Sequence, residues 1–334
     1  MPTIAFFNNK GGVGKTSLVF HLSWMFRQLG HTVLAVDLDP QANLTSMFFY
    51  DDKLESLWPS DTPHDQTIFG ALRPIIRGLG DVITPKVHEV APGLGVVAGD
   101  LELSRFEDTL SGDWPKCLDR SEPAFRTTTA FSRAIKRAQV LAEARWVLVD
   151  VGPNLGAINR AALIACDYIV VPLAPDLFSI QGLRNLGPTL TDWRSEWNER
   201  RGKAPTNMGF TPPEGRMAAL GYVVMQYAIK ASDSPVKAYT KWMARIPNEY
   251  AESVAASDGD AGDNPANDAN CLALLKHYRS LVPMAMEARK PIFNLKSSDG
   301  AIGSHLYAVE AAKDDFTKLA RKIIKRVDER EAQE

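Results

Sequence analysis

The chain has 334 residues, a formal net charge of −2 and a hydrophobic share of 45%. These values exclude a wholly disordered chain and a uniformly basic nucleic-acid coat, although a local basic patch remains open. The three cysteines, Cys117, Cys166 and Cys271, are far apart and form no Cys-x-x-Cys pair, so we expect neither a metal cluster within one chain nor a disulfide framework. No run approaches the roughly 20 apolar residues that span a bilayer, and the first residues are unlike a signal peptide, so we expect a soluble cytoplasmic protein.

The first forty residues have the pattern of a strand, a glycine-rich turn, a helix and a second strand. Residues 3–8 form a short apolar run typical of a buried strand. The apolar stripe of the helix consists of Leu18, Leu22, Met25 and Leu29. Gly30 closes this helix, and residues 32–36 form a second strand that ends at Asp37. Strands joined through a helix by short links favour a parallel sheet.

Strands and helices continue to alternate along the rest of the chain. We expect strands at 94–97, 146–149, 168–172 and 217–225, and helices at 128–145 and 180–198. The strand at 146–149 ends at Asp150. The last helix has an apolar face from Val309 to Val327 and basic residues over much of its remaining surface. Without a repeat or a clear boundary, we expect one domain over 1–334.

Two segments differ from this alternation. Residues of about 50–125 are rich in Pro, Gly, Asp and Trp, which indicates an insertion of short helices and loops over the sheet. Residues of about 251–270 are dominated by Ala, Asp, Asn, Gly and Ser. Such a composition buries too little apolar surface to repay ordering, so we expect a flexible acidic loop there.

A glycine-rich sequence joins the first strand to the first helix: Lys10-Gly11-Gly12-Val13-Gly14-Lys15-Thr16. Strand, loop and helix are the context that a phosphate-binding loop requires. The glycines let the backbone aim its N–H groups at phosphate oxygens, and the helix start adds the positive end of its dipole. Lys15 can reach the β- and γ-phosphates, the Thr16 hydroxyl can bind Mg²⁺, and Ser17 can hydrogen-bond the α-phosphate. We therefore predict a three-layer α/β/α P-loop NTPase with a mostly parallel central sheet.

The loop departs from the usual pattern because Asn9 stands where a glycine is expected and Lys10 adds a second lysine. In this respect it resembles the deviant Walker A motif of the ParA/MinD family of P-loop ATPases, and within it the ParA/Soj partition ATPases. The resemblance covers nearly the whole chain. It includes 36–43, the Walker B-like segment 147–156, 167–176 with Gly182, and the end of the chain from Lys290 to the last helix.

The resemblance implies a weak, partner-stimulated ATP hydrolase that forms a homodimer around ATP and Mg²⁺. Lys10 would reach the partner's nucleotide and Asp39 would orient the attacking water, so the candidate catalytic residues are Lys10, Lys15 and Asp39. The candidate nucleotide-binding residues are Lys10, Gly11, Gly12, Val13, Gly14, Lys15, Thr16, Ser17 and Pro247. The candidate Mg²⁺ ligands are Thr16, Asp37 and Asp150. An aspartate at a strand end can also be only a helix cap or a turn former.

Two departures from the family pattern concern the switch region and the base. Residues 151–154 read Val-Gly-Pro-Asn, and no arginine follows Pro247, which the resemblance would place on adenine. The guanine-reading sequence Asn-Lys-x-Asp is absent from the chain, which favours ATP.

Three outputs of such a switch stay open. The first is DNA partition or cargo positioning through nonspecific DNA, with nucleoid association and a ParB-like or other stimulating protein; residues 271–326 carry eleven Lys or Arg against five Asp or Glu. This basic surface can also be only solvated. The second is MinD-like membrane positioning, which the acidic tail at 328–334 disfavours. The third is a regulatory ATPase that docks a protein complex through the insertion, in a mobile-element or defence system.

Overall fold

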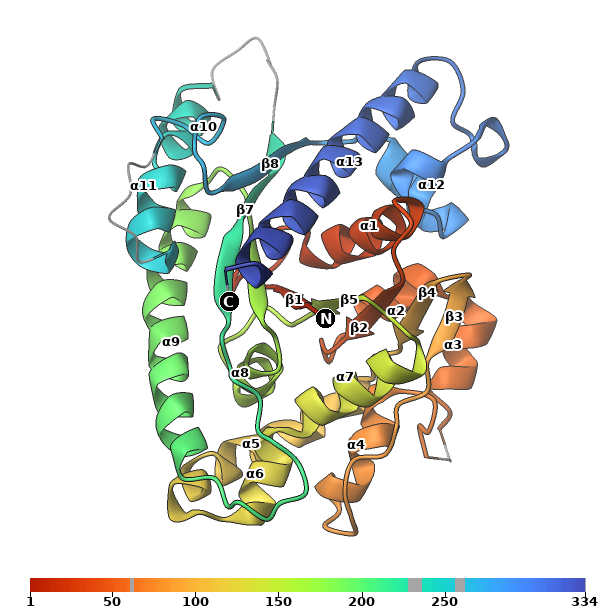
Figure 1. Cartoon of the computed structure of the whole chain (residues 1–334). Helices are drawn as coiled ribbons and strands as arrows, with labels where there is room; N and C mark the ends of the chain where they lie inside the picture. The colour runs from red at the N-terminus through yellow and green to blue at the C-terminus, as the bar shows by residue number, and fades with distance from the viewer. Residues whose placement is uncertain (61–62, 228–235, 256–261, 334) are drawn as a thin grey trace.

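The computed structural model describes residues 1–60, 63–227, 236–255 and 262–333. Its sheet has eight strands in the order β3-β4-β2-β5-β1-β6-β7-β8 (Figure 1). Every neighbouring pair is parallel except β3 and β4. The strands are β1 (Thr3–Phe6), β2 (Val33–Asp37), β3 (His88–Ala91), β4 (Leu94–Val97), β5 (Trp146–Asp150), β6 (Tyr168–Leu173), β7 (Ala218–Tyr227) and β8 (Cys271–Lys276).

Helices cover both faces of this sheet. The longer ones are α1 (Lys15–Gln28), α7 (Ala130–Leu141), α9 (Leu177–Gly202) and α13 (Ser304–Glu331). The shorter ones are α2 (Asn43–Phe48), α3 (Asp51–Leu57), α4 (Ile68–Ile76), α5 (Phe106–Asp113), α6 (Glu122–Thr128), α8 (Ala157–Ile164), α10 (Val236–Met243), α11 (Ile246–Tyr250) and α12 (Leu281–Ala288). None of the helices in the described part of the chain is long and apolar enough to cross a membrane.

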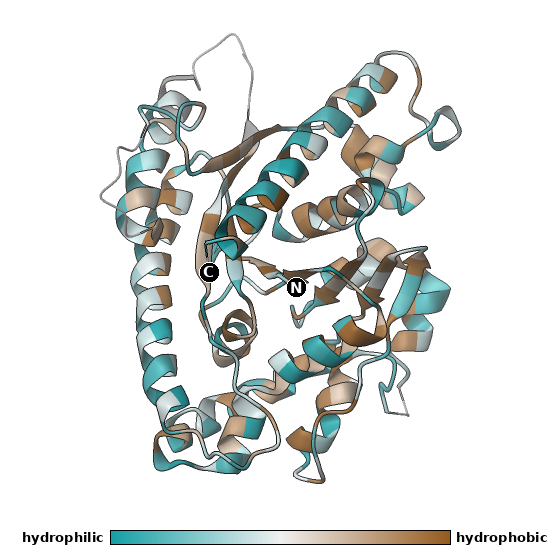
Figure 2. Cartoon of the chain, in the orientation of Figure 1, coloured by the Kyte–Doolittle hydropathy of each residue, from teal (hydrophilic) through white to brown (hydrophobic). Residues whose placement is uncertain are grey.

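Alternate residues of each strand face two different cores. Ala5, Val147 and Val149 pack with α4–α9, whereas Ile4 and Leu148 pack with α1, α2 and α13. Figure 2 shows the strands as mostly hydrophobic and the outer side of α13 as mostly hydrophilic. This period-2 division of buried side chains is that of a sheet covered on both faces. The predicted three-layer α/β/α fold with a mostly parallel sheet is thus confirmed.

The edges of the sheet differ from the sequence prediction. β3 is an antiparallel edge strand, and β8 closes the other edge directly after the expected loop at 251–270. Residues 251–255 continue α11 as a π-helical turn, and 256–261 lie outside the described residues. Further on, Asp268 is buried and accepts a hydrogen bond of 2.6 Å from the Tyr222 hydroxyl. Part of the expected loop is therefore built into the fold.

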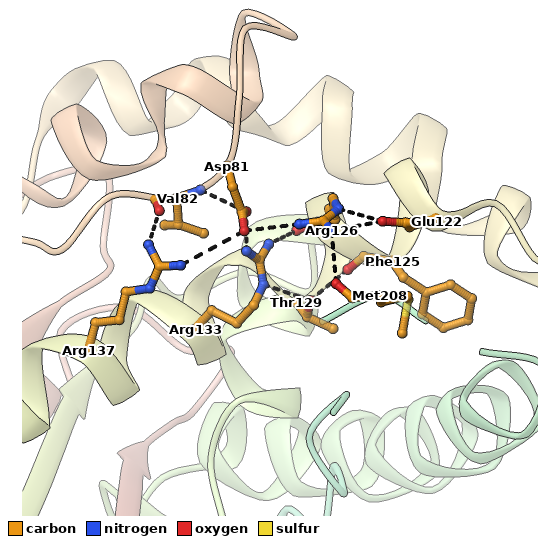
Figure 3. A network of polar contacts seen from close by, with 9 residues as sticks. All are labelled: Asp81, Val82, Glu122, Phe125, Arg126, Thr129, Arg133, Arg137 and Met208. Carbon is orange, nitrogen blue, oxygen red and sulfur yellow. Dashed lines mark hydrogen bonds and ion pairs between the residues drawn. The ribbon is translucent and has the colours of Figure 1, made fainter. Parts of the chain in front are cut away.

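The segment at 50–125 packs closely on the rest of the molecule. Asp81, after α4, accepts hydrogen bonds from Arg126 at 3.0 Å and from Arg133 (Figure 3). Arg137 lies 3.9 Å from the same carboxylate. Arg126 also donates to the Met208 carbonyl at 2.8 Å, which joins this network to the loop after α9. The predicted short helices are present, and their contacts make the segment part of one face of the molecule.

The three cysteines are buried and unpaired. Burial raises the pKa of all three thiols, most strongly at Cys166. They lie in different elements: Cys117 follows α5, Cys166 precedes β6, and Cys271 opens β8.

Candidate functional site

The loop between β1 and α1 has the backbone of an anion site. Gly12 and Gly14 have positive φ angles of 73° and 88°, which glycine adopts without strain. Gly14 caps α1 and, being glycine, brings no side chain to the first amides of this helix. Free N–H groups at the start of a 14-residue helix favour a phosphate group.

Lys15 is the cation of this loop and is held under it. Its side chain is buried, and its Nζ donates to the Lys10 carbonyl at 3.2 Å. Burial lowers the pKa of the Lys15 ammonium, while Asp150 and Asp39 act in the opposite direction. A bound phosphate would add a further negative charge beside this buried ammonium, next to those of Asp150 and Asp39.

Asp37 and Asp150 face each other at the ends of β2 and β5, where they are paired in register. Both are fully buried. Asp37 accepts hydrogen bonds from the Thr45 amide at 2.9 Å, the Thr45 hydroxyl at 2.7 Å and the Asp39 amide at 3.2 Å. Burial raises the pKa of Asp37 to about 7. The oxygens of Asp37 are therefore already occupied by the chain's own donors.

Asp150 has no such partners. Neither of its buried oxygens accepts a hydrogen bond of normal geometry from the described residues. Burial and the neighbouring Asp37 raise the pKa of Asp150 well above its usual range, although Thr16 and Lys15 lower it. A buried carboxylate with free lone pairs beside a threonine hydroxyl fits a hard cation such as Mg²⁺. The residues present thus fit a Mg²⁺ site formed by Thr16 and Asp150, with Asp37 next to Asp150 on the neighbouring strand.

Asp39 belongs to the same site. It is buried, and its Oδ1 accepts a hydrogen bond from the Gln41 amide at 3.0 Å. A Cβ atom added at Gly152 would lie 3.3 Å from that oxygen, so Asp39 lies against the loop that follows Asp150. The structure therefore brings Asp39, Asp150 and Lys15 together, as the order of the strands requires.

An open cavity of about 500 Å³ lies over these residues. The predicted site residues that line it are Gly11, Gly12, Gly14, Lys15, Thr16, Ser17 and Asp39. Val13 is buried and does not line it. Sequence reasoning missed the other walls, which are His21, Gln41, Asn43, Ser46, Met47, Pro153, Val282, Ala285, Met286, Arg289 and Ile292. A strand prediction at 271–276 would have indicated α12, because in a parallel sheet the segment after that strand begins at the same edge as the phosphate loop.

Of the other predicted residues, Asp37 and Asp150 are buried and do not line the cavity, and Lys10 and Pro247 lie away from it. The Lys10 ammonium forms an ion pair with Asp176, which caps α9, and lies 5.8 Å from the centre of the Phe178 ring. Pro247 is buried in the first turn of α11 and is not among the residues lining the cavity. A role of Lys10 on a second nucleotide and a contact of Pro247 with adenine stay predictions.

Comparison with known proteins agrees with this fold. The family profile described as an AAA domain matches residues 1–201. A putative replication protein A from Sinorhizobium fredii is 31% identical over 188 residues, which are 55% of this chain and 42% of that protein. The chromosome partitioning protein ParA of Caulobacter vibrioides is 27% identical over 200 residues, which are 60% of this chain and 66% of that protein. The chain belongs to this AAA domain family and is a ParA-like P-loop ATPase.

Solved structures give the same fold over the whole chain. Protein DIP2308 from Corynebacterium diphtheriae superposes with a TM-score of 0.67 at 23% identity, covering 98% of both chains. A putative plasmid partition protein from Borrelia burgdorferi, bound to AMPPNP, has a TM-score of 0.61 at 15% identity, covering 97% of this chain and 99% of that one. At these identities the likeness concerns the fold alone, and the matches to the two curated relatives span only 42% and 66% of their lengths.

Proposed function

We propose that this chain is a slow Mg²⁺-dependent ATPase switch of the partition type, which dimerises on ATP and then binds DNA without sequence preference. The observation that carries the ATPase part is the pairing of Asp150, buried with free lone pairs, with Lys15, a buried ammonium under a free helix start. Mg²⁺ would supply the partner that the Asp150 oxygens lack among the described residues, and a phosphate would bind the Lys15 ammonium and the amides at the helix start.

The residues of the site would have distinct roles. Thr16 and Asp150 would hold Mg²⁺. Asp37, through its hydrogen bonds with Thr45, would orient the groups around that ion. When bound, Mg²⁺ offsets the charge of the phosphate oxygens. Lys15 and the loop amides would bind the phosphates. Asp39 would hold the attacking water, because it borders the cavity and its side chain accepts only one hydrogen bond from the described residues, that of the Gln41 amide. The nucleotide analogue AMPPNP in the Borrelia protein's structure supports ATP as the ligand.

The surroundings of Lys10 support a second copy of the chain as partner. Lys10 lies outside the cavity of its own chain, next to Leu177 and Phe178 at the start of α9. Leu177 is 49% exposed and Phe178 is 72% exposed, and Leu155 after the Asp150 loop is 39% exposed. Exposed apolar groups beside the nucleotide site gain from burial in a dimer that forms over ATP.

The basic residues of α13 divide into two groups. Arg326 donates to the Leu220 carbonyl at 2.6 Å, and Arg330 donates to the Ala219 carbonyl at 2.8 Å. Lys322 likewise donates to a backbone carbonyl at the start of β8. These three residues hold the helix on the sheet. The exposed ones, which would face DNA phosphates, are Lys313, Lys318, Arg321 and Lys325.

The test uses Asp39→Ala, which should bind ATP and Mg²⁺ but not hydrolyse it. Light scattering should give the mass of a dimer with ATP and of a monomer with ADP. Nonspecific duplex DNA should bind the ATP form, and more weakly as salt rises. Wild-type hydrolysis by Asp39→Ala would refute the role of Asp39, and a persistent monomer would refute dimer closure.

The DNA surface is tested in the same background. Lys318→Glu should weaken binding about tenfold, because it turns a phosphate contact into a repulsion. Lys136→Glu makes the same charge change on an exposed position of α7, on the other face of the sheet, and should leave the affinity unchanged. A dimer that ignores DNA altogether would shift the output to a protein or a membrane.

A further inference from the structure

Glu107, near the start of α5, holds the helix that follows the Asp150 loop. Its Oε1 accepts a hydrogen bond from the Ala157 amide at 2.5 Å, and its Oε2 accepts one from the Ile158 amide at 2.8 Å. These are the first two amides of α8. A Cβ atom at Gly156 would lie 2.7 Å from Oε1, so only glycine lets the carboxylate approach so closely. A single side chain from the insertion thus caps α8 with both oxygens.

The first turn of α8 holds the loop that follows Asp150 through hydrogen bonds. Asn159 is fully buried, and its side-chain amide donates to the Gly152 carbonyl at 2.8 Å and to the Asn154 carbonyl at 2.7 Å. The Asn154 side chain accepts a further bond of 2.9 Å from the Gly156 amide. The loop therefore takes its shape from α8 more than from its own sequence.

This loop borders the reacting groups. Gly152 lies against the Asp39 carboxylate, and Pro153 lines the cavity. Pro153 also lies 4.0 Å from the position of a Cβ atom at Gly11 in the phosphate loop. A shift of α8 would therefore displace the loop residues that lie beside Asp39 and beside the place where a γ-phosphate would lie.

The end of α5 is bonded to two neighbouring helices. Trp114 follows α5, and the guanidinium groups of Arg160 and Arg200 each lie 4.2 Å from the centre of its ring. Its indole N–H donates to Glu196 at 2.9 Å, and its carbonyl accepts from Arg200 at 3.0 Å. Since Arg160 belongs to α8 and Arg200 to α9, the end of α5 is fixed to both helices.

We propose that Glu107 is a positioning residue for hydrolysis: through α8 and Asn159 it holds the loop after Asp150 in the arrangement that aligns Asp39. The inference rests on the proposed ATPase activity. It gives the insertion at 50–125 a direct connection to the nucleotide site, so that a ligand or protein that moves α5 would change the rate of hydrolysis without touching ATP.

The experiment compares Glu107→Ala and Glu107→Gln with two controls. Asp108→Asn removes an exposed charge from the next position of α5. Leu110→Ala removes core contacts from the same helix, and it serves as the control for a general loss of stability. For each protein one measures the melting temperature, the Kd of a nonhydrolysable ATP analogue with Mg²⁺, kcat, and hydrogen exchange of the peptide covering 151–164.

We expect Glu107→Ala to lower kcat about tenfold while Kd changes less than about threefold, because misplaced groups cost rate more than ground-state binding. Exchange at 151–164 should rise. Glu107→Gln, which keeps one acceptor, should lie between Glu107→Ala and the wild type. Leu110→Ala should melt earlier at nearly unchanged kcat.

An unchanged kcat in Glu107→Ala despite faster exchange would overturn the proposal, since the cap would then be only structural. Unchanged exchange would overturn it as well. A wild-type protein without ATPase activity would instead refute the proposed function, and the exchange measurement would still report whether Glu107 holds the loop.

Discussion

Two lysines of the phosphate loop lie five residues apart in very different surroundings. Lys15 is buried under the loop between the carbonyl of Lys10 and two carboxylates, whereas the Lys10 ammonium is paired with Asp176 outside the cavity. Lys15→Ala should therefore weaken binding of a nonhydrolysable ATP analogue about 100-fold or more, since it removes a buried charged donor to phosphate. Titration calorimetry with Mg²⁺ present measures this loss.

Lys10→Ala is the matched control for this measurement. It should keep most of the binding but lose ATP-driven dimer closure and hydrolysis, because its ammonium would act on the partner's nucleotide. Equal loss of affinity in the two variants would mean that Lys10 binds the nucleotide of its own chain.

The sequence identified the phosphate-loop side of the cavity and Asp39, because both follow predicted strands, but it missed the walls that α2 and α12 contribute. It could not show that Asp37 accepts hydrogen bonds from Thr45 and Asp39, since this depends on how α2 folds back over β2. Nor could it show that neither oxygen of Asp150 accepts a hydrogen bond of normal geometry from the described residues. Nor could it place Lys10 against α9, because Asp176 is 166 positions away in the chain.

Among the elements, α6 and α7 are joined to the loop after α4 through Asp81, which accepts hydrogen bonds from Arg126 and Arg133. Arg133 is nearly buried, with 9% of its side chain exposed, and in Asp81→Asn it loses its only carboxylate partner among the described residues. We expect this variant to lose about 1–3 kcal/mol of unfolding free energy at pH 7. Urea denaturation measures the loss. Asp328→Asn, which breaks an exposed pair with Arg145, should cost less than about 1 kcal/mol.

The contacts of Asp81 with the arginines also predict how the stability of the protein depends on pH. Burial raises the pKa of the Asp81 carboxyl, but the hydrogen bonds from Arg133 and the Val82 amide and the charges of Arg133 and Arg126 hold this pKa below the usual value of 3.8. The stabilisation is therefore fully present above that value and is lost as the pH falls below it. The difference between wild type and Asp81→Asn should thus be constant from pH 7 to 5 and shrink below about pH 4. A difference that grew on acidification would contradict this assignment.

The central elements could be predicted because β1, α1, β2 and β5 are buried runs with regular spacing. The edge elements could not. β3 is a partly exposed strand in which His88 and Glu89 break the apolar pattern. β8 is a six-residue apolar run, too short to separate a strand from a helix by periodicity. Its partner β7 and the buried side of α13 determine which of the two it becomes.

On the scale of the whole molecule, one sheet separates two cores. Trp146 lies in the core under α1 and α13, and Trp197 lies in the core under α5–α9. Because the same strands supply both cores, we propose that residues 1–334 form one domain and lose both cores together. Fluorescence of Trp146→Phe and Trp197→Phe should give melting midpoints that each agree with circular dichroism of the same variant. Midpoints more than about 5 °C apart would indicate two units that unfold separately.

The burial of all three cysteines has a practical consequence. Thiol reagents react with the thiolate at an accessible sulfur, and here each sulfur is covered and its pKa is raised. The folded chain is therefore nearly inert toward maleimide dyes and mild oxidants. A cysteine placed at an exposed position such as Phe178 would be the one reactive sulfur of the protein. The native sequence thus already serves as the background for crosslinking and for single-molecule labels.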